Sequence, residues 1–262
     1  MITLYVFGPA FGLPDASHFV MKTEVQLKMA KLAYRKDPTG YPNAPKGKLP
    51  YIEDKGRLVP DSTFIRAYIE KTYGRDLDAG LDAWARAQSW TIERLVEDHL
   101  GWAMAYFRWL VPQNFEKGPA HFFDAAPDAV RSKLRDDALL RVTTAMKGHG
   151  IGRHSQAEVA ELGSRSLEAL SALLGEGPYM MGDGPTSVDA ITFATLACVL
   201  TRFFDTPLRA KAQSLENLPP YVARMMERFY PEHEWDKAPI PARAASQAAG
   251  ITRSRRRGAV AA

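Results

Sequence analysis

A proline that opens a short apolar strand, with a helix start close behind it, constrains the fold of this chain most. The strand lies in Gly47-Lys48-Leu49-Pro50-Tyr51-Ile52-Glu53-Asp54, and a charged turn leads from it to Asp61-Ser62. Proline cannot donate to a strand ladder, so it is tolerated at an edge, at a first residue or in a special turn. Asp61 and Ser62 open a helix whose free N–H groups and positive dipole end suit a carboxylate. We therefore expect a backbone edge beside a helix N-terminus, where a small peptide can be held.

Composition narrows the class of protein. The chain has 262 residues, 46% hydrophobic and 24% charged, so it can bury a sizeable core without disulfides. Its single cysteine, Cys198, excludes an intramolecular disulfide and a Cys/His zinc cluster, so we expect no metal and a reducing, cytoplasmic setting. The Arg-rich run 253–257 supplies much of the net charge of +4, so we expect no nucleic-acid partner. No run of about 18 apolar residues occurs, so we expect no membrane span.

Hydrophobic patterning predicts a small α/β unit in the first part of the chain. Residues 2–7 read as a strand and residues 17–33 as a helix. The pattern of 37–47 is that of a loop, and it leaves open whether this region also contains a strand. Strands 49–53 and 57–59 form a hairpin around Lys55-Gly56, and a helix follows over 61–73. This order predicts an α/β sandwich with a mixed sheet over residues 1–74.

The remainder reads as helical. Residues 75–80 are a polar linker, and an all-helical unit extends over 81–235. The helices expected there cover 81–110, closed by Pro112, then 128–146, 156–174, a buried central helix over 186–204, and 218–230. Residues 236–262 have little periodicity and are predicted to form a basic, disordered tail.

This arrangement resembles the glutathione S-transferase superfamily. Three pieces carry the resemblance: Leu49-Pro50-Tyr51, the helix start at Asp61-Ser62, and the helix cap Gly182–Ala190. A narrower resemblance, to the metaxin-like, failed-axon-connections branch, rests on Gly47–Ile69, Asp98–Trp109 and Met180–Ala190. The resemblance implies an N-terminal thioredoxin-like, glutathione-binding domain over 1–74, followed by an all-helical domain of the glutathione-transferase type.

The resemblance also implies a glutathione site. Leu49 would offer its backbone to the cysteinyl part, beside a cis Pro50, although Pro50 can equally serve as a turn-shaping residue of the fold. Ser62 would take the γ-glutamyl carboxylate with help from Asp61, although both are also ordinary helix caps. Lys48 would attract the anionic tripeptide, and its other interpretation is a solvated loop lysine.

Transferase chemistry needs a hydrogen-bond donor that favours the thiolate. Ser17, at the start of the first helix, is the candidate, and its alternative role is helix capping. His18 beside it reads as a surface histidine, and its alternative role is that of an anion-binding group. Trp102, Tyr106 and Trp109 share a helix face that, by resemblance, borders a hydrophobic co-substrate pocket, and we take Trp102 and Tyr106 as its candidate residues. The alternatives are domain core and dimer interface.

These observations lead to two hypotheses. The first is a homodimeric glutathione S-transferase-like enzyme that uses reduced glutathione as co-substrate and conjugates it to a small hydrophobic electrophile. The second is a non-catalytic, metaxin-like binding or adaptor protein. The thiol-activating position separates them, because the branch often has Ser-Pro-Phe-Cys where this chain has Ser17-His18-Phe19-Val20 and so lacks the cysteine.

Overall fold

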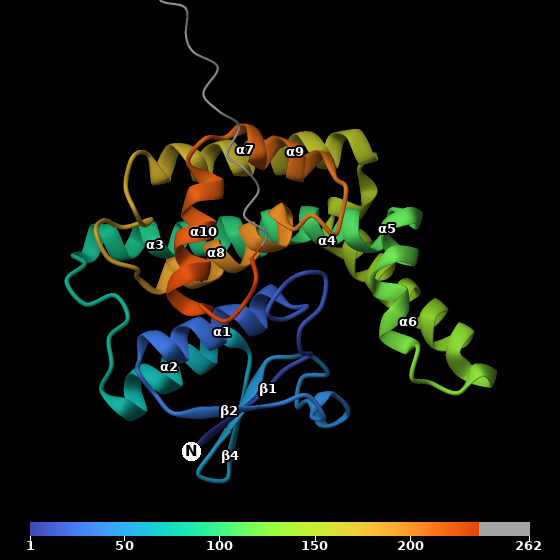
Figure 1. The fold of residues 1–262 in the computed structure, drawn as a ribbon, viewed down its shortest axis with the longest axis horizontal. Helices are drawn as coiled ribbons and strands as arrows, with labels where there is room; N and C mark the ends of the chain where they lie inside the picture. Colours follow the sequence, from blue (N-terminus) through green and yellow to red (C-terminus); the bar gives the residue numbers. More distant parts are fainter. Residues whose placement is uncertain (236–262) are drawn as a thin grey trace, which may run out of the picture.

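The computed structural model describes residues 1–235, so the predicted tail 236–262 lies outside the described residues. The first part of the chain forms a four-stranded sheet in the order β2-β1-β3-β4 with two helices against it (Figure 1). The β1–β2 pair is parallel, and the β1–β3 and β3–β4 pairs are antiparallel. The predicted mixed sheet is therefore confirmed. The elements are β1 (Ile2–Tyr5), α1 (His18–Met29), β2 (Tyr34–Asp37), β3 (Tyr51–Asp54), β4 (Arg57–Pro60) and α2 (Ser62–Tyr73).

Helices make up the second part of the chain. They are α3 (Ala83–Leu95), α4 (Gly101–Trp109), α5 (Pro112–Lys117), α6 (Asp128–His149), α7 (Gln156–Leu174), α8 (Ser187–Leu200), α9 (Pro207–Ser214) and α10 (Leu218–Phe229). The helical pattern expected over 81–110 is helical without a break from 83 to 109, and the π-helical turn Val96–Leu100 divides this run into α3 and α4. Pro112 does not close that helix; it lies at the start of α5, where its missing N–H costs nothing. No helix in residues 1–235 is both long and apolar enough to cross a membrane.

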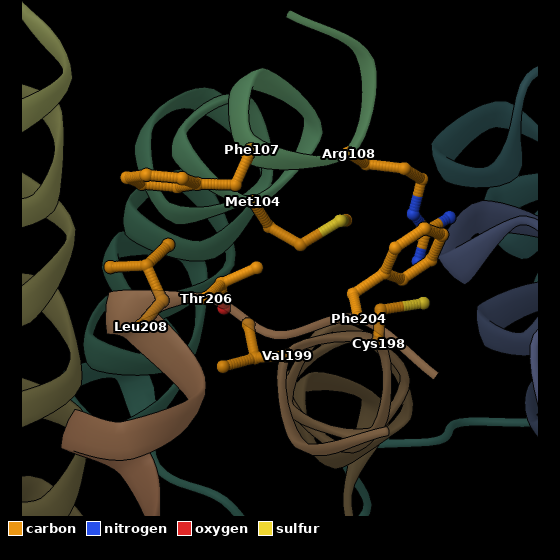
Figure 2. A pocket seen from close by; sticks show the side chains of 8 residues that line it. All are labelled: Met104, Phe107, Arg108, Cys198, Val199, Phe204, Thr206 and Leu208. Carbon is orange, nitrogen blue, oxygen red and sulfur yellow. The ribbon is translucent and has the colours of Figure 1, made fainter. Parts of the chain in front are cut away.

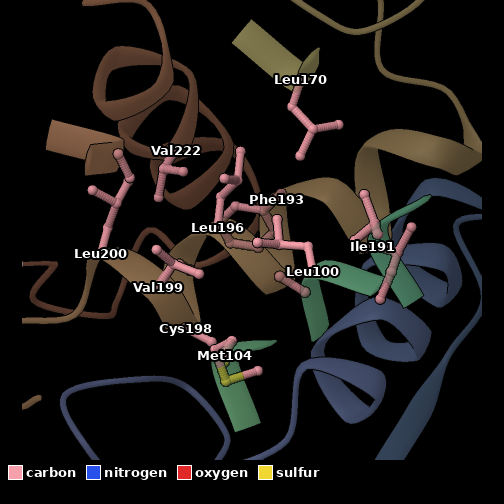
Figure 3. Close-up of a cluster of buried hydrophobic side chains, with 14 of the residues drawn as sticks. Leu100, Met104, Leu170, Ile191, Phe193, Leu196, Cys198, Val199, Leu200 and Val222 are labelled. Atoms are coloured by element: carbon pink, nitrogen blue, oxygen red, sulfur yellow. The ribbon is translucent and has the colours of Figure 1, made fainter. Parts of the chain in front are cut away.

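The core of the helical part surrounds α8. Every residue of this helix is buried, which confirms the expected central helix, although it ends at Leu200 rather than at 204. Figure 3 shows its side chains, among them Phe193 and Leu196, between α10 on one side and Leu100 of the π-helical turn and Met104 of α4 on the other. A capping box at Thr186 and Asp189 starts the helix, and the Asp189 carboxylate also accepts hydrogen bonds from Met180 N and the Tyr221 hydroxyl.

Helices α1 and α2 lie between the sheet and the helical part (Figure 1), and α1 packs on α8. A buried ion-pair group joins the two parts: Lys22 Nζ of α1 lies 3.0 Å from Glu93 and 2.6 Å from Glu97. The residue Asp78, in the predicted linker, is also buried. Its carboxylate accepts hydrogen bonds from Ser187 N and Oγ at the start of α8, and from Arg66 of α2. The linker is therefore part of the packed structure.

Candidate functional site

Topology brings the predicted site segments to one end of the sheet. Tyr5, the last residue of β1, pairs with Tyr51, the first of β3, and Tyr51 in turn pairs with Pro60, the last of β4. Three segments therefore lie at the same end of the strands: the loop from β1 to Ser17, the segment Leu49-Pro50 and the start of α2. Because α1 follows that loop and α2 follows Pro60, both helix N-termini belong to this end, where their positive dipole ends favour an anion.

The Leu49-Pro50 peptide bond is cis, and both residues are buried. The Pro50 carbonyl accepts a hydrogen bond from Asp61 N at 3.2 Å, which ties this segment directly to the start of α2. Behind it, the Tyr51 ring stacks on Tyr5 at 4.0 Å, and the Tyr51 hydroxyl donates to the Gly40 carbonyl. The proline segment is thus held from the sheet side and from the helix side.

The start of α2 carries three of the predicted residues. Asp61 is the N-cap, and its carboxylate accepts a hydrogen bond from Thr63 N at 3.1 Å. Ser62, at the first helical position, is 4% exposed. Lys48 Nζ lies 3.4 Å and Lys46 Nζ 4.0 Å from the Asp61 carboxylate, so Lys48 forms an ion pair with another predicted site residue. These lysines are exposed, and they add positive charge to the mouth of the site.

Ser17 caps α1, and its hydroxyl accepts a hydrogen bond from Val20 N at 3.4 Å. The loop before it is organised by Asp15, which the sequence reasoning missed. The buried Asp15 carboxylate accepts hydrogen bonds from the backbone N–H groups of Phe7, Gly8 and Ser17. Burial raises the pKa of Asp15 to about 7 despite these three donors. An aspartate two residues before a helix-capping serine was the available sequence signal for such a loop.

The expectation of a surface histidine at position 18 is wrong. His18 Nε2 is buried and has no hydrogen-bond partner within residues 1–235, and an added Cβ on Gly101 of α4 would lie 3.3 Å from it. Burial, with the charges of Arg108 and Lys22, lowers the pKa of His18 to about 3. The imidazole is therefore neutral at pH 7 and is part of the contact between α1 and α4.

Trp102 and Tyr106 do not meet the Ser17 loop in any ring contact of the described residues. Trp102 stacks on His149 of α6 at 4.4 Å, and Tyr106 packs on Phe107 within its own helix. The aromatic rings at this loop are those of Phe7 and Phe11, which belong to the loop, and that of Phe122, and the sequence did not predict a role for them.

The three rings are connected through Trp109 to a pocket in the helical part. The Phe122 ring lies 6.5 Å from Phe7, 5.4 Å from Phe11 and 6.2 Å from Trp109 of α4. Trp109 lines a pocket of about 460 Å³ between α4, α5 and α6, which also contains Phe115. Phe7 and Phe122 are each 44% exposed, so the loop end of this aromatic group is open to solvent.

Comparison with known proteins agrees with this architecture. Residues 18–114 match the family of the glutathione S-transferase N-terminal domain, and residues 163–225 match that of the C-terminal domain. The isoprene-epoxide–glutathione S-transferase of Rhodococcus sp. (strain AD45) is 31% identical over 236 residues, which cover 87% of this chain and 99% of that protein. The chain belongs to the glutathione S-transferase superfamily.

Within this superfamily, the similarity extends to the metaxin-like branch. Failed axon connections of Drosophila melanogaster is 32% identical over 253 residues, covering 90% of this chain and 59% of that protein. The chain therefore spans about three-fifths of the length of that relative. Metaxin-2 of Mus musculus is 27% identical, covering 74% of this chain and 73% of that protein.

Solved structures show the same fold. The crystal structure of a glutathione S-transferase from Methylobacterium radiotolerans JCM 2831, in complex with glutathione sulfonate, superposes with a TM-score of 0.56. It is 17% identical, and the match covers 90% of this chain and 96% of that one. The predicted fold class, a thioredoxin-like α/β domain followed by a transferase-type helical domain, is thus confirmed.

Proposed function

We propose that this protein binds reduced glutathione at the end of its sheet and conjugates it to a small electrophile. The observation that carries the proposal is that three segments lie at the same end of the sheet strands: Leu49-Pro50, the start of α2 and the start of α1. Two helix N-termini and two exposed lysines give this end a positive potential, which suits a ligand that carries two carboxylates. Reduced glutathione is such a ligand.

Each predicted residue has a role in this proposal. The Leu49 backbone, before the cis proline, offers hydrogen bonds to the cysteinyl part of the peptide. Ser62 donates to the γ-glutamyl carboxylate, and Asp61 accepts from the γ-glutamyl amine. Ser17, at the positive end of α1, donates to the sulfur and favours the thiolate, which is the nucleophilic form.

The electrophile that we propose to test first is a small epoxide, because an epoxide is named in the Rhodococcus relative. The thiolate attacks one ring carbon, the C–S bond forms, and the C–O bond breaks. The resulting alkoxide takes a proton from solvent, which balances the reaction. The open aromatic surface of Phe7 and Phe122 supports an apolar co-substrate beside Ser17.

A second candidate function is a binding or adaptor protein without transferase chemistry. One observation favours it: the predicted ligand groups are already engaged, since Ser17 caps α1, and Asp61 pairs with Lys48 and caps α2. The similarity to metaxin-2 and Failed axon connections supports the same alternative.

Calorimetry with reduced glutathione separates the two. We expect the wild-type protein to bind, and Ser62→Ala to weaken binding by about 10-fold to 100-fold, because a hydrogen bond to a charged group contributes about 1.5–3 kcal/mol. The matched control is Ser155→Ala, which removes a serine cap from the exposed start of α7. No heat of binding with the wild-type protein at millimolar glutathione would exclude the transferase proposal.

An epoxide conjugation assay then tests the chemistry. Ser17→Ala is expected to lower kcat/KM by about 100-fold, the usual cost of one lost donor to a developing anion. Ser155→Ala should leave kcat/KM unchanged. If glutathione binds and Ser17→Ala conjugates as fast as the wild-type protein, Ser17 is not the thiolate-stabilising residue. If glutathione binds and no electrophile reacts, the adaptor function is the better one.

A further inference from the structure

Arg108 of α4 is a buried cation without a counter-anion. It is 7% exposed, and no carboxylate in residues 1–235 lies within ion-pair distance of its guanidinium. Its Nε and Nη2 atoms are buried without hydrogen-bond partners there. Burying an unpaired charge is costly, so a position of this kind is seldom explained by packing alone.

The surroundings of this guanidinium are mostly apolar. The rings of Phe11 and Phe204 lie on it, each at 5.1 Å from ring centroid to Cζ. Figure 2 shows Arg108 reaching from α4 toward the Phe204 ring and the Cys198 thiol of α8. The adjoining cavity is about 10 Å³, room for about one water molecule. An apolar, nearly closed setting screens the charge weakly, so its field reaches neighbouring groups.

The hydrogen bond from Arg108 to the backbone leads to the candidate catalytic loop. Its Nη1 donates to the Ala16 carbonyl at 2.8 Å, and Ala16 directly precedes the α1 cap Ser17. The pKa of His18, the residue after Ser17, is lowered first by burial and then by the charge of Arg108, so this charge acts on the start of α1. The cation is therefore placed behind the helix terminus that would face a bound thiol.

None of the other charged groups near this terminus in residues 1–235 forms an ion pair with Arg108. Lys22 of α1 is paired with Glu93 and Glu97, and His18 is neutral at pH 7. Burial raises the pKa of the Cys198 thiol, which keeps it neutral as well. The Asp15 carboxylate of the loop is the opposing group, and it accepts three backbone N–H groups rather than a bond from Arg108. On the outer side, Asp205 pairs with Arg209, and Lys117 lies over the Phe203 ring.

We propose that Arg108 is a positioning residue for thiol chemistry at Ser17: it fixes the Ala16 carbonyl, and its uncompensated positive charge favours the thiolate of bound glutathione. This inference rests on the proposed glutathione-binding function. It adds a residue from the helical domain, 91 positions beyond Ser17 in the sequence, to the machinery of the α/β domain.

Three variants separate the charge of Arg108 from its anchoring hydrogen bond. Arg108→Gln keeps an N–H donor for Ala16 and loses the charge, whereas Arg108→Lys keeps the charge. Thr201→Val removes a different anchor of the same loop, the hydrogen bond from Thr201 Oγ1 to the Phe11 carbonyl at 2.6 Å, without a change of charge. Glutathione affinity by calorimetry and the pH profile of kcat/KM are measured for each variant and for the wild-type protein.

The pH midpoint of kcat/KM decides the outcome. We expect Arg108→Gln to raise this midpoint by about one pH unit. At pH values well below the midpoint, kcat/KM would then be about 10-fold lower than in the wild-type protein. Thr201→Val is expected to stay within about 0.3 unit of the wild-type midpoint. Arg108→Lys is expected to raise the midpoint by less than Arg108→Gln does, because a buried ammonium keeps its proton less firmly than a guanidinium. Should Arg108→Gln not fold, Arg108→Met takes its place, since apolar side chains of similar volume often replace buried charges without loss of stability.

Three results would overturn the inference. A folded Arg108→Gln protein with the wild-type midpoint would show that the charge does not act on the thiol. If Thr201→Val raised the pH midpoint of kcat/KM as much as Arg108→Gln does, the effect would come from anchoring of the loop and not from the charge. A wild-type protein that fails to bind glutathione would remove the proposed function and this inference with it, and the wild-type measurement alone identifies that case.

Discussion

Asp78 offers the sharpest test of how the two domains are held together. Its carboxylate lies in the linker, is 3% exposed, and accepts hydrogen bonds from Ser187 N at 2.9 Å, Ser187 Oγ at 3.0 Å and Arg66 Nη2 at 2.6 Å. It therefore connects the linker, the start of α8 and helix α2. The substitution Asp78→Ala removes all three bonds and leaves two buried donors and part of a guanidinium without this partner.

The size of the effect follows from these contacts. Removing one partner of a buried ion pair costs about 3–5 kcal/mol, and Arg66 keeps its pair with Glu70 at 3.0 Å, which favours the lower end. We therefore expect Asp78→Ala to lower the free energy of unfolding by about 3 kcal/mol, or the melting temperature by about 6–12 °C. Asp78→Asn keeps an acceptor for Ser187 N and should lose about 1–2 kcal/mol.

Urea unfolding, followed by tryptophan fluorescence and by far-ultraviolet circular dichroism, measures these differences where the two transitions coincide. The matched control is Asp137→Ala, which breaks an ion pair with Lys133 on the surface of α6 and should change stability by less than about 1 kcal/mol. If Asp78→Ala is no more destabilising than Asp137→Ala, the linker does not join the domains as argued.

Two further predictions concern stability. Because the pKa of His18 is about 3 when folded and near 6.5 when unfolded, the unfolded chain takes up the proton first, and stability is lost as the pH falls from 6.5 toward 3 at about 1.4 kcal/mol per unit. In urea titrations between pH 7 and 5, His18→Leu should lose less stability than the wild-type protein. Asp15, whose pKa is raised, changes stability in the opposite direction over this range, but it does so equally in both proteins. Equal losses in the two proteins would therefore refute the assignment to His18. In the 3₁₀ turn Ile151–Arg153 that follows α6, Gly152→Ala should cost about 1–3 kcal/mol, because the added methyl would meet backbone atoms of Met146 and Lys147 at 2.8 and 2.9 Å. Gly148→Ala, where nothing lies within 4 Å, should stabilise by up to about 1 kcal/mol, and thermal melts that rank the two glycines the other way would contradict this.

The local sequence pattern is sufficient to predict an element where the element depends on its own residues. The helix 156–174 was predicted with the bounds that the structure has, because Ser155 and Glu158 form a capping box and Gly175 follows its last residue. The pattern failed where partners are distant. The strand Tyr34–Asp37 has two exposed charged residues and forms by parallel pairing with β1, a contact that its own sequence does not announce.

The same distinction applies to the candidate site. The sequence marked Leu49-Pro50 and Asp61-Ser62, since proline at a strand mouth and aspartate and serine at a helix start are local signals. It passed over Asp78 as part of a polar linker, because the role of that carboxylate depends on Ser187, 109 positions away. Arg108 reads as one more charged residue on a helix until the fold places it beside Ala16.

The two ends of the proposed site therefore depend on different parts of the chain. The carboxylate end, at Asp61 and Ser62, is held mainly by β3, β4 and α2 of the first domain, with one hydrogen bond from Thr63 to Glu93 of α3. The thiol end depends on the loop before Ser17, which the helical part of the chain anchors at three points. Arg108 donates to Ala16, Thr201 donates to Phe11, and His233 lies 3.0 Å from the Gly12 carbonyl. Affinity for the peptide and reactivity of its sulfur are thus physically separable, so a protein with this fold can keep the first while the helical domain adjusts the second.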